Sequence, residues 1–304
     1  MQTKPYKTAK QHIEILEKRG LAFRDKERAE RFLLREGYYA VVNGYKDAFI
    51  DKQATNLAND DRYRQGLPFE YFELVYDFDS TLRRITMDAL LKAENAMRTA
   101  TVDAFCLYHP NHDDYLDPAC YRKKSDYKPT DKYTSGLIKL LSTLQAVHDN
   151  KHRKEYIRHY LDAYRCLPLW VASKCLTFGN MSAFFDFQQQ SVQNRACINL
   201  STALAKEKVR MRDMRFAYHT LPDFRNLCAH DERLYCTKLG KNGDKGFSEL
   251  LKALKPMMTE SEFKEYVALV VQLIDATGKN DLTLKGELLS GLGIDYDELE
   301  ALAK

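Results

Sequence analysis

Three side chains that lie close together in the sequence, Arg225, Asn226 and His230, have the types and spacing for acid–base chemistry on a phosphate. An arginine can hold a phosphate through two parallel hydrogen bonds, and a histidine, which titrates near neutral pH, can move a proton. Without a cage of carboxylates, these groups suit metal-independent cleavage of RNA, in which the 2′-hydroxyl of the substrate is the nucleophile. We expect Arg225 to bind the scissile phosphate, His230 to act as general acid or base, and Asn226 to orient the substrate or His230.

A helix is expected to carry this motif. Pro222 predicts the start of a helix that continues to residue 235. In such a helix Asn226 and His230 share a face, and the free N–H groups at its start favour an anion beside Arg225. The same spacing also occurs by chance in many helices, where Arg225 would pair with a neighbouring carboxylate and His230 would be an ordinary helix residue.

Basic residues gather just before the motif, in the segment 206–215, which has five lysines and arginines against two acidic residues. Lys208, Arg212 and Arg215 recur at helical spacing and would share one side of a helix. We expect this side, together with Arg233 behind the motif, to contact an RNA backbone. A solvated helix face is the simpler alternative.

The net charge of +4 is distributed unevenly along the chain. Residues 281–304 hold six carboxylates and two lysines, a net charge of −4, so the rest of the chain carries +8. A moderately basic body permits a nucleic-acid partner without requiring one. We hypothesise that the acidic tail screens or competes for the basic surface.

The composition of the 304 residues is that of a folded protein, with 44% hydrophobic and 30% charged residues. No window approaches the run of about 20 apolar residues that a membrane span needs. The polar start of the chain indicates no secretory signal, and seven cysteines without a CxxC pair indicate a reducing compartment. We therefore expect a cytoplasmic protein without a membrane partner.

Neither a metal nor a cofactor is expected. The sequence has no phosphate-binding GxxxxGK[ST] loop and no GxGxxG dinucleotide motif. His148 and His152 are spaced like helix ligands, but they lack an evident third ligand and stand among lysines and arginines. The segment 109–114 offers histidines and aspartates, which the composition of a polar loop explains more simply.

Few residues break helices, because the chain has only 13 Gly and 8 Pro. Apolar spacing predicts helices over 8–19 and 25–36, which Thr8 and Asp25 would cap, and over 70–108, 136–164 and 191–221. Residues 247–276 are expected to form one or two helices around Pro256. Residues 35–50 could form short strands or a compact loop, and 109–135 read as a loop or insertion. Trp170 and the cluster Phe184, Phe185 and Phe187 are expected in the core.

These elements predict an all-α fold. We expect an N-terminal helical extension over 1–69, a helical domain with the Arg-x4-His motif over 70–280, and the acidic tail over 281–304. No linker is long enough to require further domains, and no internal repeat is evident.

The motif resembles the signature of the abortive-infection (Abi-like) family of bacterial phage-defence proteins, which belongs to the HEPN superfamily of helical ribonuclease domains. The matching residues are Arg225, Asn226, Ala229, His230, Arg233 and Leu234. Further segments resemble the family in the same order along the chain, namely 7–21, 35–49, 74–99, 167–171, 176–182 and, more loosely, 288–303.

The resemblance implies a HEPN-like helical bundle with an N-terminal extension and a loop insertion. It also implies a homodimer in which two motifs build one composite endoribonuclease site, acting in phage defence or as a toxin. Glu94 and Arg98 match a Glu-x3-Arg/Lys motif of such domains. They are either an ordinary ion pair contributing about 0.3–0.5 kcal/mol, or a carboxylate that orients Arg225 or His230 beside a cation facing RNA.

Two other functions remain open at this point. One is a non-catalytic RNA-binding protein that holds a small structured RNA, including a toxin restrained by a noncoding RNA. The other is a helical module for protein interaction. Of the three, the pairing of an arginine with a titrating histidine favours the enzyme, because a pure binder needs no group that moves protons.

Overall fold

The structure is a computed structural model that describes residues 5–149, 154–279 and 281–304. Within these residues the chain forms helices joined by loops, with three isolated β-bridges and no β-strand. The prediction of an all-α fold is confirmed. None of the described helices is both long enough and apolar enough to cross a membrane.

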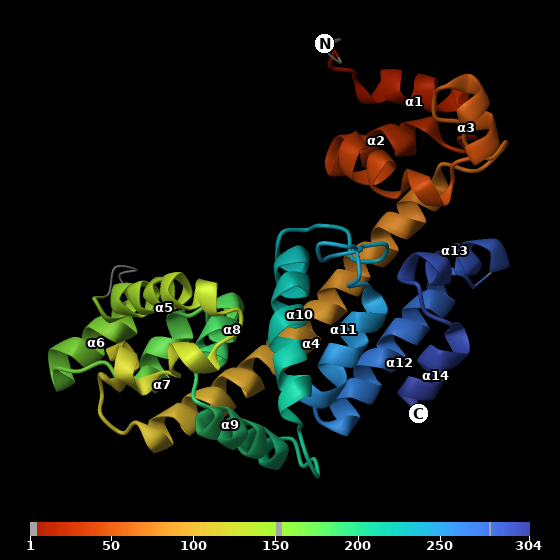
Figure 1. Ribbon diagram of the computed structural model, residues 1–304. Coiled ribbons are helices and arrows are strands. Elements are labelled where there is room, and N and C mark those ends of the chain that lie inside the picture. The colour runs from red at the N-terminus through yellow and green to blue at the C-terminus, as the bar shows by residue number, and fades with distance from the viewer. Residues whose placement is uncertain (1–4, 150–153, 280) are drawn as a thin grey trace. The chain divides into compact units, whose positions relative to one another are not determined.

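The first two helices follow the capping residues predicted from the sequence. Helix α1 (Ala9–Lys18) begins at Thr8, whose hydroxyl accepts a hydrogen bond from the backbone N–H of Gln11. Helix α2 (Lys26–Glu36) begins at Asp25, whose carboxylate accepts from the backbone N–H of Arg28. The two helices pack together beside α3 (Lys52–Ala58), as Figure 1 shows.

Residues 35–50 form a compact helical segment and no strand. A π-helical turn, η1 (Tyr39–Asn43), is followed by a 3₁₀ turn, η2 (Lys46–Ala48). The side chains of Val41, Val42 and Phe49 are buried. Apolar burial therefore holds together a segment that has little regular hydrogen bonding.

Helix α4 (Glu70–Tyr108) has the bounds that the sequence predicted. Its 39 residues include neither glycine nor proline, and buried side chains recur along it at helical spacing, such as Phe78, Leu82 and Ala89. A continuous helix-forming sequence with one apolar face explains its length.

The chain divides into two compact units. Unit 1 contains residues 1–85, 231–238 and 267–304, and unit 2 contains 86–230 and 239–266. Helix α4 gives its first part to unit 1 and the remainder to unit 2. The division into extension, domain and tail stays a prediction.

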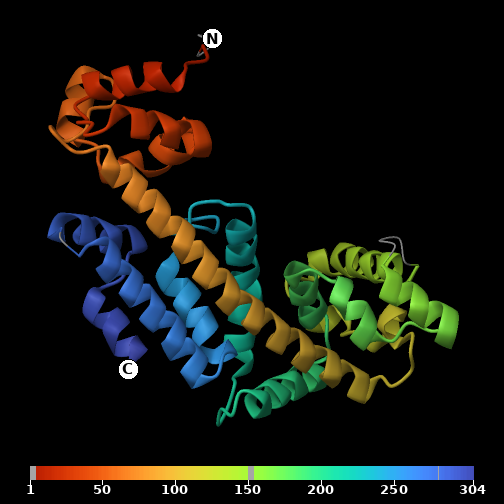
Figure 2. The ribbon, with the colours of Figure 1, turned by 180° about the vertical axis from the view of Figure 1, so that it is seen from behind.

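In unit 1 the acidic C-terminal segment is folded. It forms α13 (Leu282–Leu292) and α14 (Tyr296–Ala303), which lie beside the end of α12 (Glu260–Thr277) in Figures 1 and 2. Leu284, Leu288 and Leu299 are buried. The hypothesis that this segment screens a basic surface stays open, but deleting it would remove part of the core of unit 1.

A buried carboxylate in unit 1 holds the segment that follows the motif. Asp79 of α4 accepts hydrogen bonds from the Tyr45 hydroxyl at 2.7 Å and from the backbone N–H of Tyr235 at 2.7 Å and of Leu234 at 3.1 Å. Arg83 lies 2.7 Å from the same carboxylate. These contacts fix residues 231–238 against the first part of α4.

The predicted loop at 109–135 contains four 3₁₀ turns in unit 2, and its last three residues already belong to the next helix. The four turns are η3 (Asp114–Leu116), η4 (Pro118–Cys120), η5 (Lys124–Asp126) and η6 (Thr130–Lys132). The helices that follow, α5 (Tyr133–His148), α6 (Glu155–Tyr164), α7 (Leu169–Ala172) and α8 (Phe178–Asp186), gather into one group in Figure 1.

The predicted aromatic core is correct for three residues and wrong for one. Phe184, Phe185 and Phe187 are buried, whereas Trp170 is 50% exposed. Helix α7 has a single turn whose other side chains, including Leu169, are buried. Trp170 is the one side chain of this turn that is left half exposed.

The remaining helices of unit 2 differ from the predicted pattern. Helix α9 (Gln190–Ala203) ends well before residue 221, and α10 (Met211–Ala229) begins after an irregular segment. Helix α10 continues through Pro222, so the predicted helix start at that residue is wrong. The buried side chains Tyr218, Leu221 and Phe224 flank the proline, and their packing against α8 and α11 (Phe247–Leu254) outweighs its missing hydrogen bond.

Of the one or two helices predicted around Pro256, the structure has two. Helix α11 ends in a 3₁₀ turn, η8 (Lys255–Met257), that contains the proline, and α12 starts three residues beyond that turn. The proline interrupts the helical pattern here because it has no backbone N–H to donate and its ring crowds the carbonyl of the preceding turn.

Candidate active site

The Arg-Asn-x2-Ala-His motif lies at the C-terminal end of α10. His230 caps the helix, and its backbone N–H donates to the carbonyl of Asn226 at 2.9 Å. Asp231 has a φ of +57°, a left-handed conformation that stops the helix. The predicted continuation to residue 235 and the predicted anion site at a helix start are therefore both wrong. Binding of an anion here depends on the Arg225 guanidinium, because the carbonyl end of a helix repels negative charge.

A buried carboxylate links Arg225 to Arg98. Glu94 is 5% exposed, and its Oε2 lies 3.7 Å from Nε of Arg225. Its Oε1 accepts a hydrogen bond from Nη2 of Arg98, which also donates to the carbonyl of Leu176 at 3.1 Å. The Glu94–Arg98 ion pair of the sequence analysis is present, and the same carboxylate reaches the arginine of the motif.

The other two residues of the motif face solvent. Asn226 and His230 are exposed, and within the described part of the chain neither side chain makes a hydrogen bond or an ion pair. Arg225 is only one-third exposed, at 33% of its side chain. The end of α10 therefore presents a partly buried guanidinium, held by Glu94, with two polar side chains that are open to a ligand.

The basic residues before the motif do not form one helical face. Lys208 lies in the irregular segment that precedes α10, so its predicted alignment with Arg212 and Arg215 is wrong. Arg212 is exposed in the first turn and pairs with Asp213, at 3.4 Å. Arg215 lies almost one turn further along and donates to Oε1 of Gln193 at 2.8 Å. Their contact with RNA stays a prediction.

Arg233, the fourth predicted RNA contact, belongs to unit 1. Its guanidinium donates to the backbone carbonyl of Gly44. The residue lines a cavity of about 1300 Å³ in that unit, together with Arg64 and Arg83. Each of these two arginines pairs with a carboxylate, Glu287 and Asp79 respectively, so the charge of this cavity is largely balanced.

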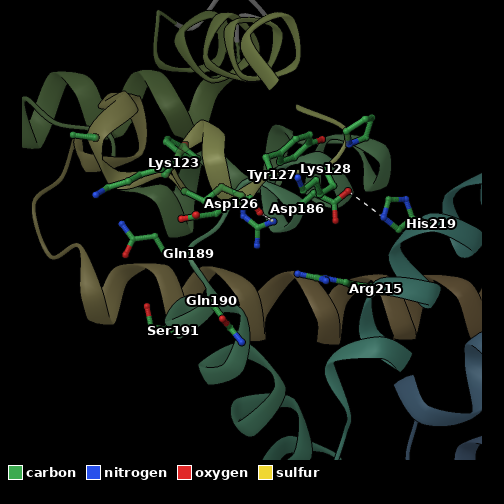
Figure 3. A pocket seen from close by; sticks show the side chains of 14 residues that line it. Lys123, Asp126, Tyr127, Lys128, Asp186, Gln189, Gln190, Ser191, Arg215 and His219 are labelled. Carbon is green, nitrogen blue, oxygen red and sulfur yellow. Dashed lines mark hydrogen bonds and ion pairs between the residues drawn. The ribbon is translucent and has the colours of Figure 1, made fainter. Parts of the chain in front are cut away.

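Unit 2 holds a second group of polar residues, of which the sequence analysis singled out only Arg215. A cavity of about 870 Å³ is lined by four cationic side chains, Arg122, Lys123, Lys128 and Arg215, and by two carboxylates. Figure 3 shows Asp186 and His219 facing each other at one side of this cavity. His219 Nε2 lies 3.1 Å from Asp186 Oδ2, and the hydrogen bond to this carboxylate raises the pKa of His219.

One group of side chains has the composition of a metal site. The ligand atoms of His109, Asp114 and Cys120 all lie within 4.8 Å of one another. Nε2 of His109 is buried without a hydrogen-bond partner, and burial lowers the pKa of this imidazole, which favours its neutral form. These are three of the ligand types that zinc accepts, but no fourth ligand joins them among the described residues. The expectation of a metal-free protein stays open.

Of the two other histidines considered as metal ligands, the structure describes only His148. His148 lies with Nε2 3.6 Å from a carboxylate oxygen of Asp113. His152, its expected partner at helical spacing, lies outside the described residues.

A comparison with models of known protein families assigns this chain to a family. The model for Abi-like proteins matches residues 31–236, which is more than half of the chain and includes Glu94 and the motif. The chain belongs to the Abi-like protein family. Membership indicates a role in abortive infection, a form of phage defence. No curated protein and no solved structure matches the chain.

Proposed function

We propose that this Abi-like protein is a metal-independent endoribonuclease whose active centre contains Arg225, Asn226 and His230. One observation carries the proposal. The buried carboxylate of Glu94 forms an ion pair with the arginine of the motif, at 3.7 Å and without a hydrogen bond, while the asparagine and the histidine at the same helix end are exposed. A cation and a free imidazole at the same helix end suit a phosphate that reacts by proton transfer.

The reaction proposed is an attack of the RNA on itself. The 2′-oxygen forms a bond to phosphorus while the bond from phosphorus to the 5′-oxygen breaks. A neutral imidazole takes the proton of the 2′-hydroxyl, and an imidazolium gives a proton to the departing 5′-oxygen. The products are a 2′,3′-cyclic phosphate and a 5′-hydroxyl. Arg225 stabilises the negative charge that builds up on the phosphate oxygens.

Two imidazoles serve this reaction better than one, because the base and the acid act on different oxygens. Each copy of the chain supplies one His230. The resemblance to HEPN domains implies that two motifs meet in a homodimer, so that one histidine is the base and the other the acid. Sedimentation equilibrium tests this part directly, with a dimer mass expected and a monomer mass at micromolar concentration contradicting it.

Glu94 has a positioning role in this proposal. Its carboxylate lies between two guanidinium groups, those of Arg225 and Arg98. Because the carboxylate is buried, its interaction with each cation is stronger than at the surface, and Arg225 is held before the substrate arrives. Asn226 is placed to donate a hydrogen bond to the substrate or to His230.

The cellular consequence follows from the family. Cutting RNA in an infected cell would stop growth and thereby limit the phage. The alternative function, holding a structured RNA without cutting it, draws on the cationic cavity in unit 2, which would suit binding as well as catalysis.

The test compares variants of the exposed histidine and the arginine. Purified protein, His230→Ala and Arg225→Ala are incubated with RNA in the presence of EDTA. His159→Ala and Arg158→Ala are matched controls, because both of these residues are exposed on α6. We expect cleavage by the wild type and the controls only.

Cleavage by His230→Ala at the wild-type rate would refute the proposal, and so would a strict need for Mg²⁺. If intact RNA co-purifies with the wild type and is never cut, the RNA-holding alternative is correct.

A further inference from the structure

We propose that the cavity between Arg122 and Arg215 in unit 2 binds a phosphate group, supplied by an RNA strand or by a free nucleotide. This site differs from the motif at the end of α10. It does not depend on cleavage by His230.

Two guanidinium groups are held side by side in this cavity. Nη2 of Arg122 and Nη2 of Arg215 donate to the same oxygen, Oε1 of Gln193, at 3.0 Å and 2.8 Å. Gln193 is fully buried, and its own amide donates to the carbonyl of Phe185 at 2.7 Å. Nε of Arg122 donates to the carbonyl of Gln188 at 2.9 Å. The two cations are therefore fixed in place by neutral groups.

The repulsion between these cations is not balanced by a carboxylate between them. Burial and the nearby charge of Arg215 both lower the pKa of Arg122. The charges of Asp186 and Asp126 offset this lowering only in part, and Asp186 also pairs with His219. A phosphate bound between the guanidinium groups would supply the missing negative charge and form hydrogen bonds with both forks.

Two lysines add to the positive charge at the rim. Lys123 and Lys128 are exposed, and neither forms an ion pair within the described part of the chain. Four cations thus line the cavity against two carboxylates, Asp126 and Asp186. In the cavity of unit 1, by contrast, carboxylates pair with two of the three arginines, Arg64 and Arg83. A cluster that served only to stabilise the fold would be expected to show the same pairing.

The size and the remaining lining suit a nucleotide. A volume of about 870 Å³ lies in the range of ligand pockets. Figure 3 shows Gln189, Gln190 and Ser191, at the start of α9, on the side of the cavity away from His219. The ring of Tyr127, which stacks on Phe187 with centroids 4.6 Å apart, contributes an aromatic wall.

The test measures binding of two probes that the protein cannot cut, a 2′-O-methyl RNA hexamer and AMP. The variants are Arg215→Gln and Lys128→Gln, with Lys139→Gln on the exposed face of α5 as the control. One of the two probes is expected to bind in the cavity. We expect Arg215→Gln to raise the Kd of that probe about tenfold, as the loss of a charge-assisted hydrogen bond implies. If that probe is the hexamer, the salt dependence should fall by about one phosphate contact. Lys128→Gln should raise the Kd about two- to threefold, and the control should change nothing.

The two probes distinguish the sources of the phosphate. A response of the hexamer alone identifies an RNA strand, and a response of AMP identifies a free nucleotide. Lys128 is exposed, so Lys128→Gln tests phosphate binding in the cavity even if Arg215→Gln fails to fold. An unchanged Kd for both probes in the folded variants overturns the proposal. Because neither probe can be cleaved, this outcome is independent of the outcome for His230.

Discussion

Helix α10 carries an arginine and a histidine in two places. Arg215 and His219 lie at the cavity, and Arg225 and His230 lie at the C-terminal end. In each place a carboxylate from another helix pairs with one of these two residues, but not with the same residue type. At the helix end Glu94 pairs with the arginine, and in the cavity the carboxylate pairs with the histidine.

The partner of the carboxylate determines which group stays available. At the end of α10 the histidine is free, which suits proton transfer. In the cavity the arginine faces a second arginine across a neutral amide oxygen, which suits an anion. Similar residue types on one helix are thus the basis of two different proposals, cleavage at one place and phosphate binding at the other.

The largest effect is expected from removing the free histidine. His230→Ala should lower the single-turnover cleavage rate about 100-fold or more at saturating RNA, because proton transfer contributes that much. Arg215→Gln should leave this saturated rate within about threefold, since binding and not chemistry is weakened. A rapid-quench time course at several RNA concentrations measures both quantities. Equal losses of saturated rate in the two variants would contradict the proposed division of roles.

A smaller effect is expected at the carboxylate that holds Arg225. Glu94→Gln removes the charge that positions the guanidinium, and misplacement of such a group lowers the rate by up to about 100-fold. The variant should also lose about 1–3 kcal/mol of unfolding free energy, because Arg98 and Arg225 lose a buried partner.

Glu155→Gln on the exposed face of α6 is the matched control. Urea unfolding and cleavage rates are measured on both variants. A stable Glu94→Gln protein with full activity would show that the carboxylate does not position Arg225.

The smallest effect concerns pH and the paired histidine. The hydrogen bond to Asp186 raises the pKa of His219 above its ordinary value of 6.5, while burial and then the charges of Lys245 and Arg215 oppose this shift. The ion pair therefore stabilises the fold fully below pH 6.5, and this contribution is lost as pH rises through the raised pKa.

His219→Gln should be less stable than the wild type at pH 5.5 by less than about 1 kcal/mol, since His219 is more than half exposed. The difference should shrink by pH 8.5, which thermal unfolding across this range would measure. A difference that grows with pH would mean that the charged pair is absent.

The sequence was sufficient for elements that depend on local chemistry. Thr8 and Asp25 cap their helices as predicted, and α4 has the expected bounds. Two features depend on packing and were predicted wrongly. At Pro222, packing of the neighbouring side chains keeps the helix intact. At Trp170, the orientation of a single turn decides the exposure of the side chain.

The candidate site was predictable in its residue types but not in its surroundings. The Glu94–Arg98 pair follows from spacing on one helix, whereas the approach of Arg225 to Glu94 joins segments that are distant in the chain. The cavity was missed for the same reason. Its cations come from the loop around Arg122 and from α10, and only the fold brings them to one amide oxygen.

The central claim is that the free 2′-hydroxyl of RNA is the nucleophile and that no metal takes part. The ends of the RNA fragments test this claim most directly, after incubation with the purified protein in EDTA. We predict 2′,3′-cyclic phosphate and 5′-hydroxyl ends, both absent with His230→Ala. Fragments with 3′-hydroxyl and 5′-phosphate ends, or cleavage only after Mg²⁺ is added, would contradict it.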